Sequence, residues 1–372
     1  MVKVLFLIHS LIGGGAEKVL VNLVNNIDRK KFDVSVTVLF GGGVNEKFLA
    51  NDIHFRSVFP KIVPGNSHVM KLLTPQQLHR ICVKEHYDIE ISYLEGPSAR
   101  VISGCKDPNT KLVSWIHVEQ HTMEKLAYAF RNQEEAIECY NRFHQTICVS
   151  KFVQDDFCNI LNFKKPCGVL YNTVESDEIV NKAQEKVCNI MGDKKFRMIA
   201  VGTLKESKGY DRLIRIVKRL RDEKYLIRLY ILGVGPMQAQ IEKFIVDNKL
   251  EDTIVLLGYQ TNPYKYLAKC NLFVCASYAE GFSTAATESL IVGTPVCTVD
   301  VSGMKEMLGN NNEYGIVTHN SEEALYAGIK RFLNDSELLD HYKKMAIKRG
   351  KDFSTLQTVS AVEDMLEKIM EM

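Results

Sequence analysis

Two glutamates frame the segment that carries the strongest chemical signal in this sequence. The run LFVCASYAEGFSTAATESL predicts a strand, a turn at Glu280 and Gly281, and a helix that begins near Ser283. The N–H groups at a helix N-terminus have no partner within the helix and carry partial positive charge, so they can bind a diphosphate. Free phosphate would be repelled by the carboxylates of Glu280 and Glu288, whereas sugar hydroxyls would hydrogen-bond to them. The segment is therefore typical of a nucleotide diphosphate sugar site.

A plain helix cap is the alternative interpretation of the same residues. Ser283 or Thr284 would then accept an N–H hydrogen bond, and both glutamates would face solvent. A capping box does not explain Glu288, because that motif needs its acid three residues after the cap, and Glu288 stands five residues after Ser283. If the segment binds a ligand, the backbone donors are a continuous run: Phe282, Ser283, Thr284 and Ala285.

A lysine after another predicted strand could neutralise the diphosphate. In VGTLKESKGYDRLI the strand ends at a glycine, and Lys208 precedes Gly209 where a helix is expected to begin. A cation at this place would stabilise the negative charge that grows on a leaving group as the glycosidic bond breaks. The alternative is a solvated loop lysine.

Glycines follow the first predicted strand and would let the backbone approach a substrate. A GxGxxG alignment that starts at Gly13 places Lys18 at the third glycine position, and Gly14 and Gly15 complete the run. The second strand ends in FGGG and lacks the acid that would hold a ribose diol, which disfavours a nicotinamide or flavin dinucleotide.

One histidine also stands at the predicted carboxyl end of a strand. His117 closes the run KLVSWIHV, where its imidazole could hydrogen-bond to a sugar hydroxyl; the alternative is a structural histidine. No spacing of His, Cys or acidic residues predicts a metal site, and the ten cysteines show no CxxC pair. We therefore expect no bound metal and no organic cofactor.

These residues need a scaffold of alternating strands and helices, and the chain supplies two such series. Runs such as FDVSVTVLF, DIEISYL and KLVSWIHV fill the first half, and a second series extends from FRMIAVGTL to PVCTVD. Alternation of this kind predicts parallel sheets whose ligands lie beyond the carboxyl ends of the strands. We expect two Rossmann-like α/β domains, residues 1–175 and 176–354, with a helix at about 355–372 packing back on the first.

Composition narrows the classes of function. The chain has 372 residues, with 46% hydrophobic and 25% charged residues, which is typical of a globular protein. A formal net charge of +2 gives no support to nucleic acid binding. No apolar run approaches the roughly 20 residues that span a bilayer, so the sequence predicts a cytoplasmic protein.

A basic stretch without acids extends from His54 to Lys84. It contains five cations among several apolar residues: Arg56, Lys61, Lys71, Arg80 and Lys84. Such a composition could attach the protein to an anionic surface on the inner face of the cell membrane. The alternative is a solvated charged face above a buried apolar stripe.

Taken with their order, these motifs resemble those of the retaining glycosyltransferases of family 4, which have the two-domain GT-B fold. The resemblance covers nearly the whole chain and includes GGGAEKVLVNLV, IHVE, VSKFV, VLYNTVE, VGTLKESKGYDRLI, LGVGP, LGYQTNPYKYLAKC and EGFSTAATE. The two glutamates separated by seven residues are its most specific element.

The resemblance implies a role for each candidate. Glu280 would contact hydroxyls of the transferred sugar, Glu288 would hold the nucleotide ribose, and the amides of residues 282–285 would meet the diphosphate and the sugar. Lys208 would bind the diphosphate, His117 would lie near the donor sugar, and Gly14 and Gly15 would face the phosphates and the acceptor. Thr203 stands where the family commonly has an arginine, and Lys205 is the nearby cation that could compensate.

The resemblance also implies an activity. It suggests a retaining, metal-independent hexosyltransferase whose two sheets face each other across a cleft, with the donor held by the second domain. The donor would be a UDP-sugar, with GDP-mannose as the alternative, and the acceptor a saccharide or lipid-linked saccharide in cell-surface polysaccharide synthesis. A nucleotide-sugar epimerase of the same architecture and a catalytically inactive nucleotide-sugar-binding protein are the alternative functions.

Overall fold

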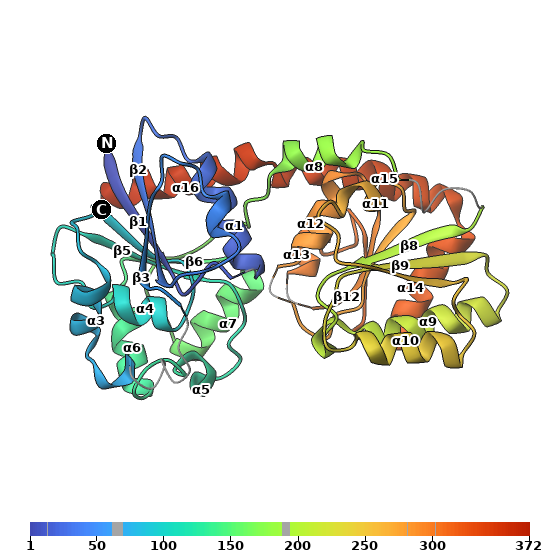
Figure 1. The fold of residues 1–372 in the computed structure, drawn as a ribbon, viewed down its shortest axis with the longest axis horizontal. Coiled ribbons are helices and arrows are strands. Elements are labelled where there is room, and N and C mark those ends of the chain that lie inside the picture. Colours follow the sequence, from blue (N-terminus) through green and yellow to red (C-terminus); the bar gives the residue numbers. More distant parts are fainter. Residues whose placement is uncertain (13, 62–69, 188–193, 281, 302) are drawn as a thin grey trace. The chain divides into compact units, whose positions relative to one another are not determined.

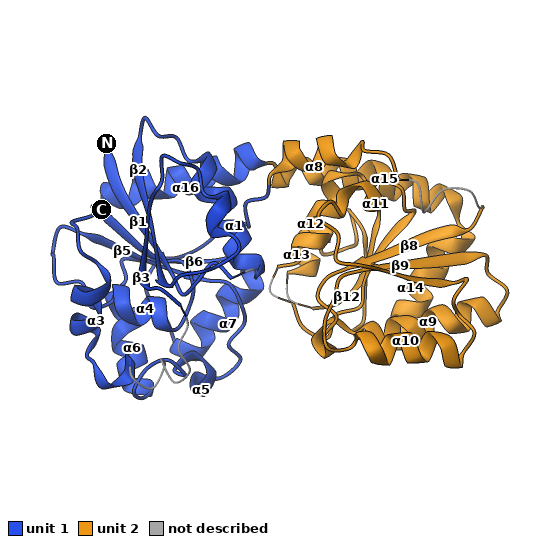
Figure 2. Ribbon diagram, viewed as in Figure 1, with its two compact units in different colours: residues 1–174, 355–372 blue, residues 175–354 orange. Residues whose placement is uncertain are grey.

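The computed structural model describes residues 1–372 except residues 13, 62–69, 188–193, 281 and 302 (Figure 1). The chain divides into two compact units, one of residues 1–174 and 355–372 and the other of residues 175–354 (Figure 2). Each unit contains its own parallel β-sheet with helices packed around it. The predicted α/β class, with two parallel-sheet domains, is confirmed.

Within the described residues, the first unit has a seven-stranded sheet in the order β3-β2-β1-β4-β5-β6-β7. Its strands are β1 (Val2–Ile8), β2 (Phe32–Phe40), β3 (His54–Phe59), β4 (Ile89–Ser92), β5 (Lys111–Ile116), β6 (Gln145–Cys148) and β7 (Cys167–Val169). Strands β1, β2, β4 and β5 are buried almost throughout because parallel strands are covered by helices on both faces. The edge strand β3 is the exception, since most of its side chains are exposed or half-buried.

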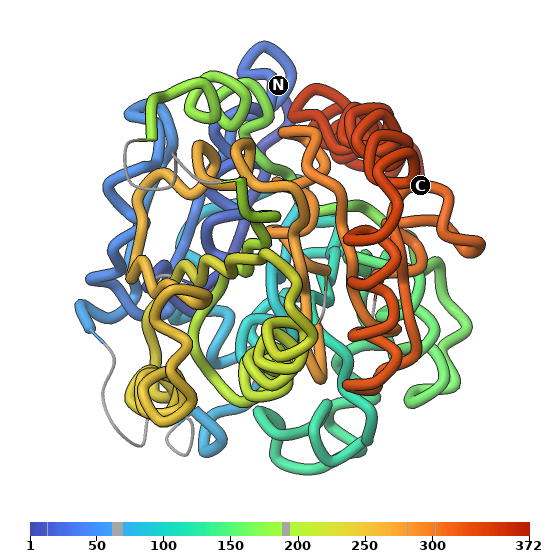
Figure 3. The backbone as a smooth tube through the Cα atoms, turned by 90° about the vertical axis from the view of Figure 1, so that its right-hand side faces the viewer, coloured from blue at the N-terminus to red at the C-terminus, as the bar shows by residue number. Residues whose placement is uncertain are grey.

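The helices of the first unit are α1 (Gly15–Asn26), α3 (Pro75–Cys82), α4 (Pro97–Ile102), α5 (Met123–Leu126), α6 (Gln133–Arg142), α7 (Lys151–Leu161) and α16 (Thr355–Met370), with a 3-10 turn η1 (Glu46–Phe48). The last of these, α16, comes from the end of the chain and packs beside α1. Its Glu363 accepts a hydrogen bond from the backbone N–H of Asp28, and Glu367 pairs with Lys31. The course of the chain can be followed in Figure 3.

The second unit has a six-stranded sheet in the order β10-β9-β8-β11-β12-β13, counted over the residues that the structure describes. Its strands are β8 (Phe196–Val201), β9 (Ile227–Leu232), β10 (Ile254–Gly258), β11 (Leu272–Cys275), β12 (Val296–Val299) and β13 (Ile316–Thr318). Its helices are α8 (Ser176–Ala183), α9 (Tyr210–Asp222), α10 (Gln238–Asp247), α11 (Tyr264–Leu267), α12 (Thr284–Ile291), α13 (Met304–Leu308), α14 (Glu322–Asn334) and α15 (Ser336–Gly350), with 3-10 turns η2 (Glu206–Lys208) and η3 (Lys351–Phe353).

The strand order of the second unit places two distant loops next to each other. From β8 the chain proceeds outward through β9 and β10, then returns to form β11 on the other side of β8. In an open parallel sheet, the crevice at such a reversal of direction is the usual ligand site. The loop after β8 carries Lys208 and the loop after β11 carries Glu280, so both flank this point.

No helix among the described residues has the length and apolar character needed to cross a membrane. The nine cysteines that the structure describes are free, and most of them are buried among apolar residues.

Candidate active site

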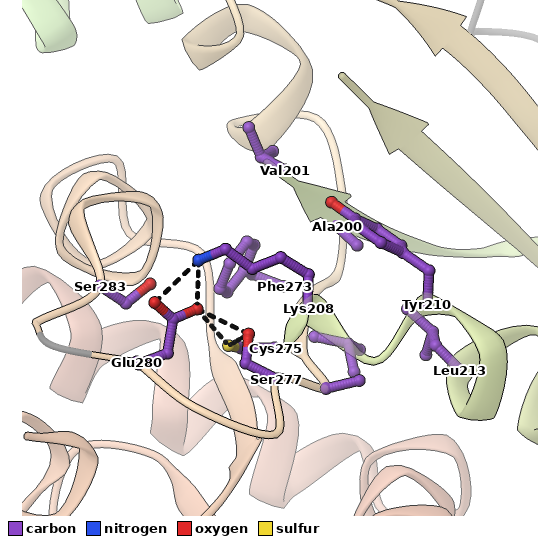
Figure 4. A pocket seen from close by; sticks show the side chains of 12 residues that line it. Ala200, Val201, Lys208, Tyr210, Leu213, Phe273, Cys275, Ser277, Glu280 and Ser283 are labelled. Carbon is purple, nitrogen blue, oxygen red and sulfur yellow. Dashed lines mark hydrogen bonds and ion pairs between the residues drawn. The ribbon is translucent and has the colours of Figure 1, made fainter. Parts of the chain in front are cut away.

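A salt bridge joins the two loops of the second unit. Lys208 Nζ lies 2.6 Å from Glu280 Oε1 and 2.8 Å from Oε2, so the ammonium group donates to both carboxylate oxygens (Figure 4). Ser277 Oγ donates a further hydrogen bond of 2.6 Å to Glu280 Oε1. The Glu280 side chain is only 9% exposed, which makes this a largely desolvated charge pair rather than a surface contact.

A small cavity opens beside this pair. Its volume is about 20 Å³, and the side chains around it include Lys208, Tyr210, Cys275, Glu280 and Ser283. Space of this size can hold a single water molecule but no sugar. A donor sugar could therefore enter this cavity only if side chains around it, such as that of Lys208, move.

Arg212 fixes the loop that leads to Glu280. The buried guanidinium donates to the carbonyl oxygens of Ala276 and Ser277, each at 2.7 Å, and lies over the ring of Tyr278. The neighbouring Gly209 has a φ of 64°, and a Cβ atom there would lie 1.8 Å from the carbonyl oxygen of Ala276. The two loops are thus in backbone contact, and only glycine allows an approach this close.

Helix α12 begins at the residues that were predicted from the sequence to bind the diphosphate. Ser283 caps it, because its Oγ accepts a hydrogen bond of 3.3 Å from the backbone N–H of Ala286. The next two N–H groups, those of Thr284 and Ala285, belong to the first turn and have no acceptor within the helix. The Phe282 side chain is buried and packs against Phe353. Gly281 lies outside the described residues.

Glu288 faces the interior of the second unit. It is 8% exposed, and the Tyr264 hydroxyl donates a hydrogen bond of 3.3 Å to its Oε1. The alternative interpretation, in which both glutamates face solvent, is wrong for Glu288 and for Glu280. Ser283 does act as a cap, as that alternative expected, and a cap leaves the first-turn amides free to bind an anion.

Thr203 and Lys205 lie between β8 and η2, and both side chains are exposed. The backbone N–H of Lys205 donates to the carbonyl oxygen of Thr203 at 2.9 Å, which folds this segment into a tight turn before Lys208. The Lys205 side chain thus extends from a loop three residues before Lys208, and Lys205 belongs to no strand.

His117, in the first unit, is a neutral and buried imidazole. Burial lowers the pKa of His117 from its usual value to about 3. Its ring lies 4.8 Å from that of Tyr93, measured between centroids, and its backbone N–H donates to the Glu95 carboxylate at 3.0 Å. Among the described residues, Nε2 of this ring has no hydrogen-bond partner. A buried ring nitrogen without a partner costs free energy, and a ligand hydroxyl would remove that cost.

Gly14 and Gly15 connect β1 to α1 in the same unit. Gly14 is the N-cap residue of α1, and a Cβ atom there would lie 2.1 Å from the Glu17 carboxylate. Among the residues that the structure describes, no atom other than those of the adjoining backbone lies within 4 Å of a Cβ built on Gly15. Gly13 lies outside the described residues.

The structure brings together Lys208, Glu280 and Ser283 within the second unit, whereas His117, Gly14 and Gly15 belong to the first. Sequence reasoning missed four residues that shape these groups: Ser277, Arg212, Tyr264 and Glu95. Glu95 follows β4 just as His117 follows β5, so its position at the carboxyl end of a strand could have revealed it. Tyr264 offers no such signal, because its contact with Glu288 arises only from helix packing.

Two family models match adjoining parts of the chain. Residues 13–178 match the model described as Glycosyltransferase Family 4, and residues 182–349 match the one described as Glycosyl transferases group 1. Together they define a glycosyltransferase, and the chain belongs to family 4. The family expected from the sequence is confirmed.

Curated relatives and solved structures agree with this assignment. The chain is 29% identical to the N-acetylgalactosamine-N,N'-diacetylbacillosaminyl-diphospho-undecaprenol 4-alpha-N-acetylgalactosaminyltransferase of Campylobacter jejuni, over 96% of this chain and 97% of the relative. It is 24% identical to the capsular polysaccharide biosynthesis glycosyltransferase CapM of Staphylococcus aureus, over 59% of this chain and 56% of that one.

The solved structures establish the fold. Anabaena HepE in complex with UDP superposes with a TM-score of 0.76 at 18% identity, over 98% of this chain and 100% of that one. Sucrose-phosphate synthase from Thermosynechococcus elongatus gives a TM-score of 0.79 at 15% identity, over 99% of both chains. The two-domain GT-B fold is confirmed.

Proposed function

We propose that this glycosyltransferase moves a hexose or N-acetylhexosamine from a UDP-sugar to a saccharide or lipid-linked saccharide during cell-surface polysaccharide synthesis, with retention of configuration and without a metal. The observation that carries the proposal is the Lys208–Glu280 salt bridge beside the N-terminus of α12. The cation and the helix amides suit the diphosphate of a nucleotide diphosphate sugar, and the buried carboxylate suits the hydroxyls of its sugar.

The donor would change the partners of both charged groups. Its diphosphate would take the Lys208 ammonium group and the first-turn amides of Thr284 and Ala285, because these are the donors at the sheet's switch point. Glu280 would then accept hydrogen bonds from sugar hydroxyls, and Glu288, held by Tyr264, would accept them from the ribose. The second unit is therefore proposed as the donor side and the first unit as the acceptor side.

Bond cleavage leaves negative charge on the diphosphate and positive charge on the sugar. Lys208 and the helix amides would stabilise the former, which is the work that a divalent cation does in metal-dependent transferases. Glu280 would stabilise the latter through hydrogen bonds that strengthen as the hydroxyls become more acidic. The acceptor hydroxyl attacks the face from which the diphosphate departs, its proton passes to the departing phosphate oxygen, and configuration is retained.

His117 would add a hydrogen bond to the donor sugar from the first unit. A neutral ring suits this role, since Nε2 can accept a hydrogen bond from a hydroxyl or donate one to it, according to its tautomer. Gly14 and Gly15 would let the β1–α1 backbone come close to the phosphates and the acceptor.

UDP is the proposed nucleotide because fold relatives have been solved with it. Anabaena HepE was determined with UDP, with UDP and glucose, and with UDP-glucose, and a mutant of Staphylococcus aureus TarM with UDP and alpha-GlcNAc-glycerol. The name of the Campylobacter relative specifies a diphospho-undecaprenol acceptor, which supports a lipid-linked saccharide. A peripheral position on an anionic membrane follows as part of the same proposal.

A panel of UDP-sugars and GDP-mannose, with and without lipid-linked and soluble saccharides, tests this function. We expect acceptor-dependent release of UDP and a product whose anomeric configuration, read by NMR, equals that of the donor. Epimerised donor formed without any acceptor would support the epimerase instead. Binding of UDP without turnover on every acceptor would support the inactive binding protein.

A further inference from the structure

Three side chains of the kinds that bind zinc meet inside the first unit. His79 lies on α3, Glu90 on β4, and Cys105 in the segment after α4. Their ligand atoms, namely one imidazole nitrogen, one carboxylate oxygen and the Sγ atom, all lie within 4.8 Å of one another. No spacing in the sequence predicts this cluster, because the three residues come from three separate elements.

The cluster is desolvated and its members already interact. Glu90 is 2% exposed and Cys105 is 3% exposed, while the His79 side chain keeps 17% of its surface. His79 Nε2 lies 2.7 Å from Glu90 Oε2. Glu90 is thus a carboxylate held inside an apolar layer, where it needs a positively charged partner.

A zinc ion would supply that charge. Zinc is bound by neutral imidazole, by carboxylate and by thiolate, so its binding displaces any proton that the imidazole or the thiol carries. With one carboxylate and one thiolate as ligands, the two positive charges of the ion are balanced within the buried layer.

The distances also suit a zinc ion. Bonds of about 2.0–2.1 Å to nitrogen, 2.0–2.2 Å to oxygen and 2.3 Å to sulfur place tetrahedral ligand atoms roughly 3.3–3.8 Å apart. The His79–Glu90 contact would have to widen from 2.7 Å by about 0.6 to 1.1 Å. The Sγ atom, which lies within 4.8 Å of both ligand atoms, would have to settle in the same range. A water molecule would complete the tetrahedron as the fourth ligand.

We propose that His79, Glu90 and Cys105 form a zinc site that stabilises the first unit and takes no part in sugar transfer. Glu90 is the second residue of β4, whereas Glu95 and His117 follow the carboxyl ends of β4 and β5. A metal at Glu90 would therefore tie α3 and the end of α4 to the amino-terminal half of the strand. The proposal does not depend on the proposed glycosyl transfer.

Metal titration of the full-length, reduced protein tests the site. After chelation and dialysis, we expect one equivalent of Zn²⁺ to bind and to raise the Tm by about 5 °C at a hundredfold excess over Kd. Co²⁺ should give a near-ultraviolet thiolate charge-transfer band. Cys105→Ser and His79→Gln should lose both effects, whereas Cys139→Ser, which removes a comparably buried thiol from α6, should keep them.

A second readout requires no substitution. Zn²⁺ should slow alkylation of Cys105 in the unaltered protein, measured by peptide mass spectrometry, and leave alkylation of Cys139 unchanged. The proposal is overturned if the wild-type protein gives no cobalt–thiolate band and no protection of Cys105. A Tm shift that persists in Cys105→Ser would overturn it as well, because the metal would then bind elsewhere.

Discussion

Lys208 donates to both carboxylate oxygens of Glu280, at 2.6 and 2.8 Å, across 72 residues of sequence. Two groups proposed to bind opposite ends of the bond that breaks are therefore bound to each other. Each balances the charge of the other in a place that is largely shielded from water. In the proposed function, donor binding replaces this contact by one between Lys208 and the diphosphate and one between Glu280 and the sugar. A substitution of either residue should therefore change the effect of substituting the other.

Glu280→Gln should lower kcat by about 100-fold or more while the protein still folds. The amide keeps the size of the side chain but cannot make charge-assisted hydrogen bonds that strengthen as the sugar becomes cation-like. Steady-state kinetics with saturating donor measure the effect. Glu206→Gln, at an exposed acid on the Lys208 loop, is the matched control and should retain wild-type activity. Near wild-type turnover in Glu280→Gln would exclude its proposed role.

Lys208→Met should lower kcat/KM for the donor by about 10- to 100-fold, which is the scale of a lost hydrogen bond to a charged group. Combined with Glu280→Gln, its effect should be much smaller than in the wild type, because the two residues act on one bond. Lys205→Met measures whether that exposed cation contributes. Full additivity of Lys208→Met and Glu280→Gln would contradict coupling through the salt bridge.

His117 should make the protein less stable in acid. The pKa of His117 is lowered to about 3 by burial, so between the unfolded value near 6.5 and pH 3 the unfolded chain binds a proton that the native chain does not. This contribution is fully present above pH 6.5 and falls as the pH decreases, approaching a slope of about 1.4 kcal/mol per pH unit. Urea unfolding of wild type and His117→Asn at pH 7, 6 and 5 should show a difference that narrows with acid.

Glu95 faces His117 and acts in the opposite direction. Burial raises the pKa of Glu95, so the native state binds this proton first and gains stability as the pH falls. Because Glu95 is present in both proteins, comparison of wild type with His117→Asn isolates the histidine. A pH-independent difference would mean that the native pKa of His117 is not lowered from its unfolded value.

EDTA should leave the initial rate of transfer unchanged. Lys208 and the first-turn amides of α12 are proposed to stabilise the leaving diphosphate, and the proposed zinc site lies in the first unit on the amino-terminal half of β4. Rates measured directly after addition of chelator, with and without added Mn²⁺ or Mg²⁺, check this. A strict requirement for either ion would contradict metal-independent transfer. Slow loss of activity on long incubation, reversed by Zn²⁺ alone, would point to stability instead.

The alternation of apolar runs along the sequence predicts much of the fold, but it does not predict which loops lie next to each other. Alternating apolar runs locate the parallel strands, since each run is buried on both faces. The adjacency of β8 and β11 depends on strand order, which no local pattern encodes, and the Lys208–Glu280 contact follows from that order. Helix α8 lies in a polar segment in which no long apolar pattern marks a helix, and it packs in the second unit through its buried residue Ile179.

The sequence does not predict the directions of the side chains either. Motif positions identified Glu288, but its contact with Tyr264 depends on how α11 packs against α12. His79, Glu90 and Cys105 have no regular spacing, and only the packing of α3 and α4 on β4 brings them together. Residues far apart in sequence become partners through packing, which composition and periodicity do not specify.

The basic stretch from His54 to Lys84 has fewer free cations than its sequence suggests. Arg56 donates to the carbonyl oxygen of Cys82 at 3.0 Å, at the C-terminus of α3, and Lys84 Nζ donates to that of Arg80 at 3.0 Å. These two cations satisfy orphan carbonyls in or just after the last turn of the helix. Residues 62–69 lie outside the described residues.

Exposed apolar side chains remain on the same stretch. Phe55 and Phe59 on the edge strand β3 are 38% and 43% exposed, and Leu72 is 78% exposed. The side chains of Lys61 and Arg80 are exposed as well. Apolar groups that enter a lipid interface, beside cations that attract anionic headgroups, are the features of a reversible membrane contact. Each such cation can contribute about 1 kcal/mol near an anionic surface.

Lys61→Ser with Arg80→Ser should therefore weaken sedimentation with anionic liposomes by about 10-fold or more, in a salt-sensitive manner. Transfer to a lipid-linked acceptor in the membrane should fall, while transfer to a soluble saccharide stays constant, because the donor is proposed to bind the other unit. Arg56→Ser serves as the comparison, since it removes a cation already held by α3. This variant should have a lower Tm but bind liposomes nearly as well as the wild type. Equal sedimentation of wild type and the double variant would assign this stretch to a solvated face.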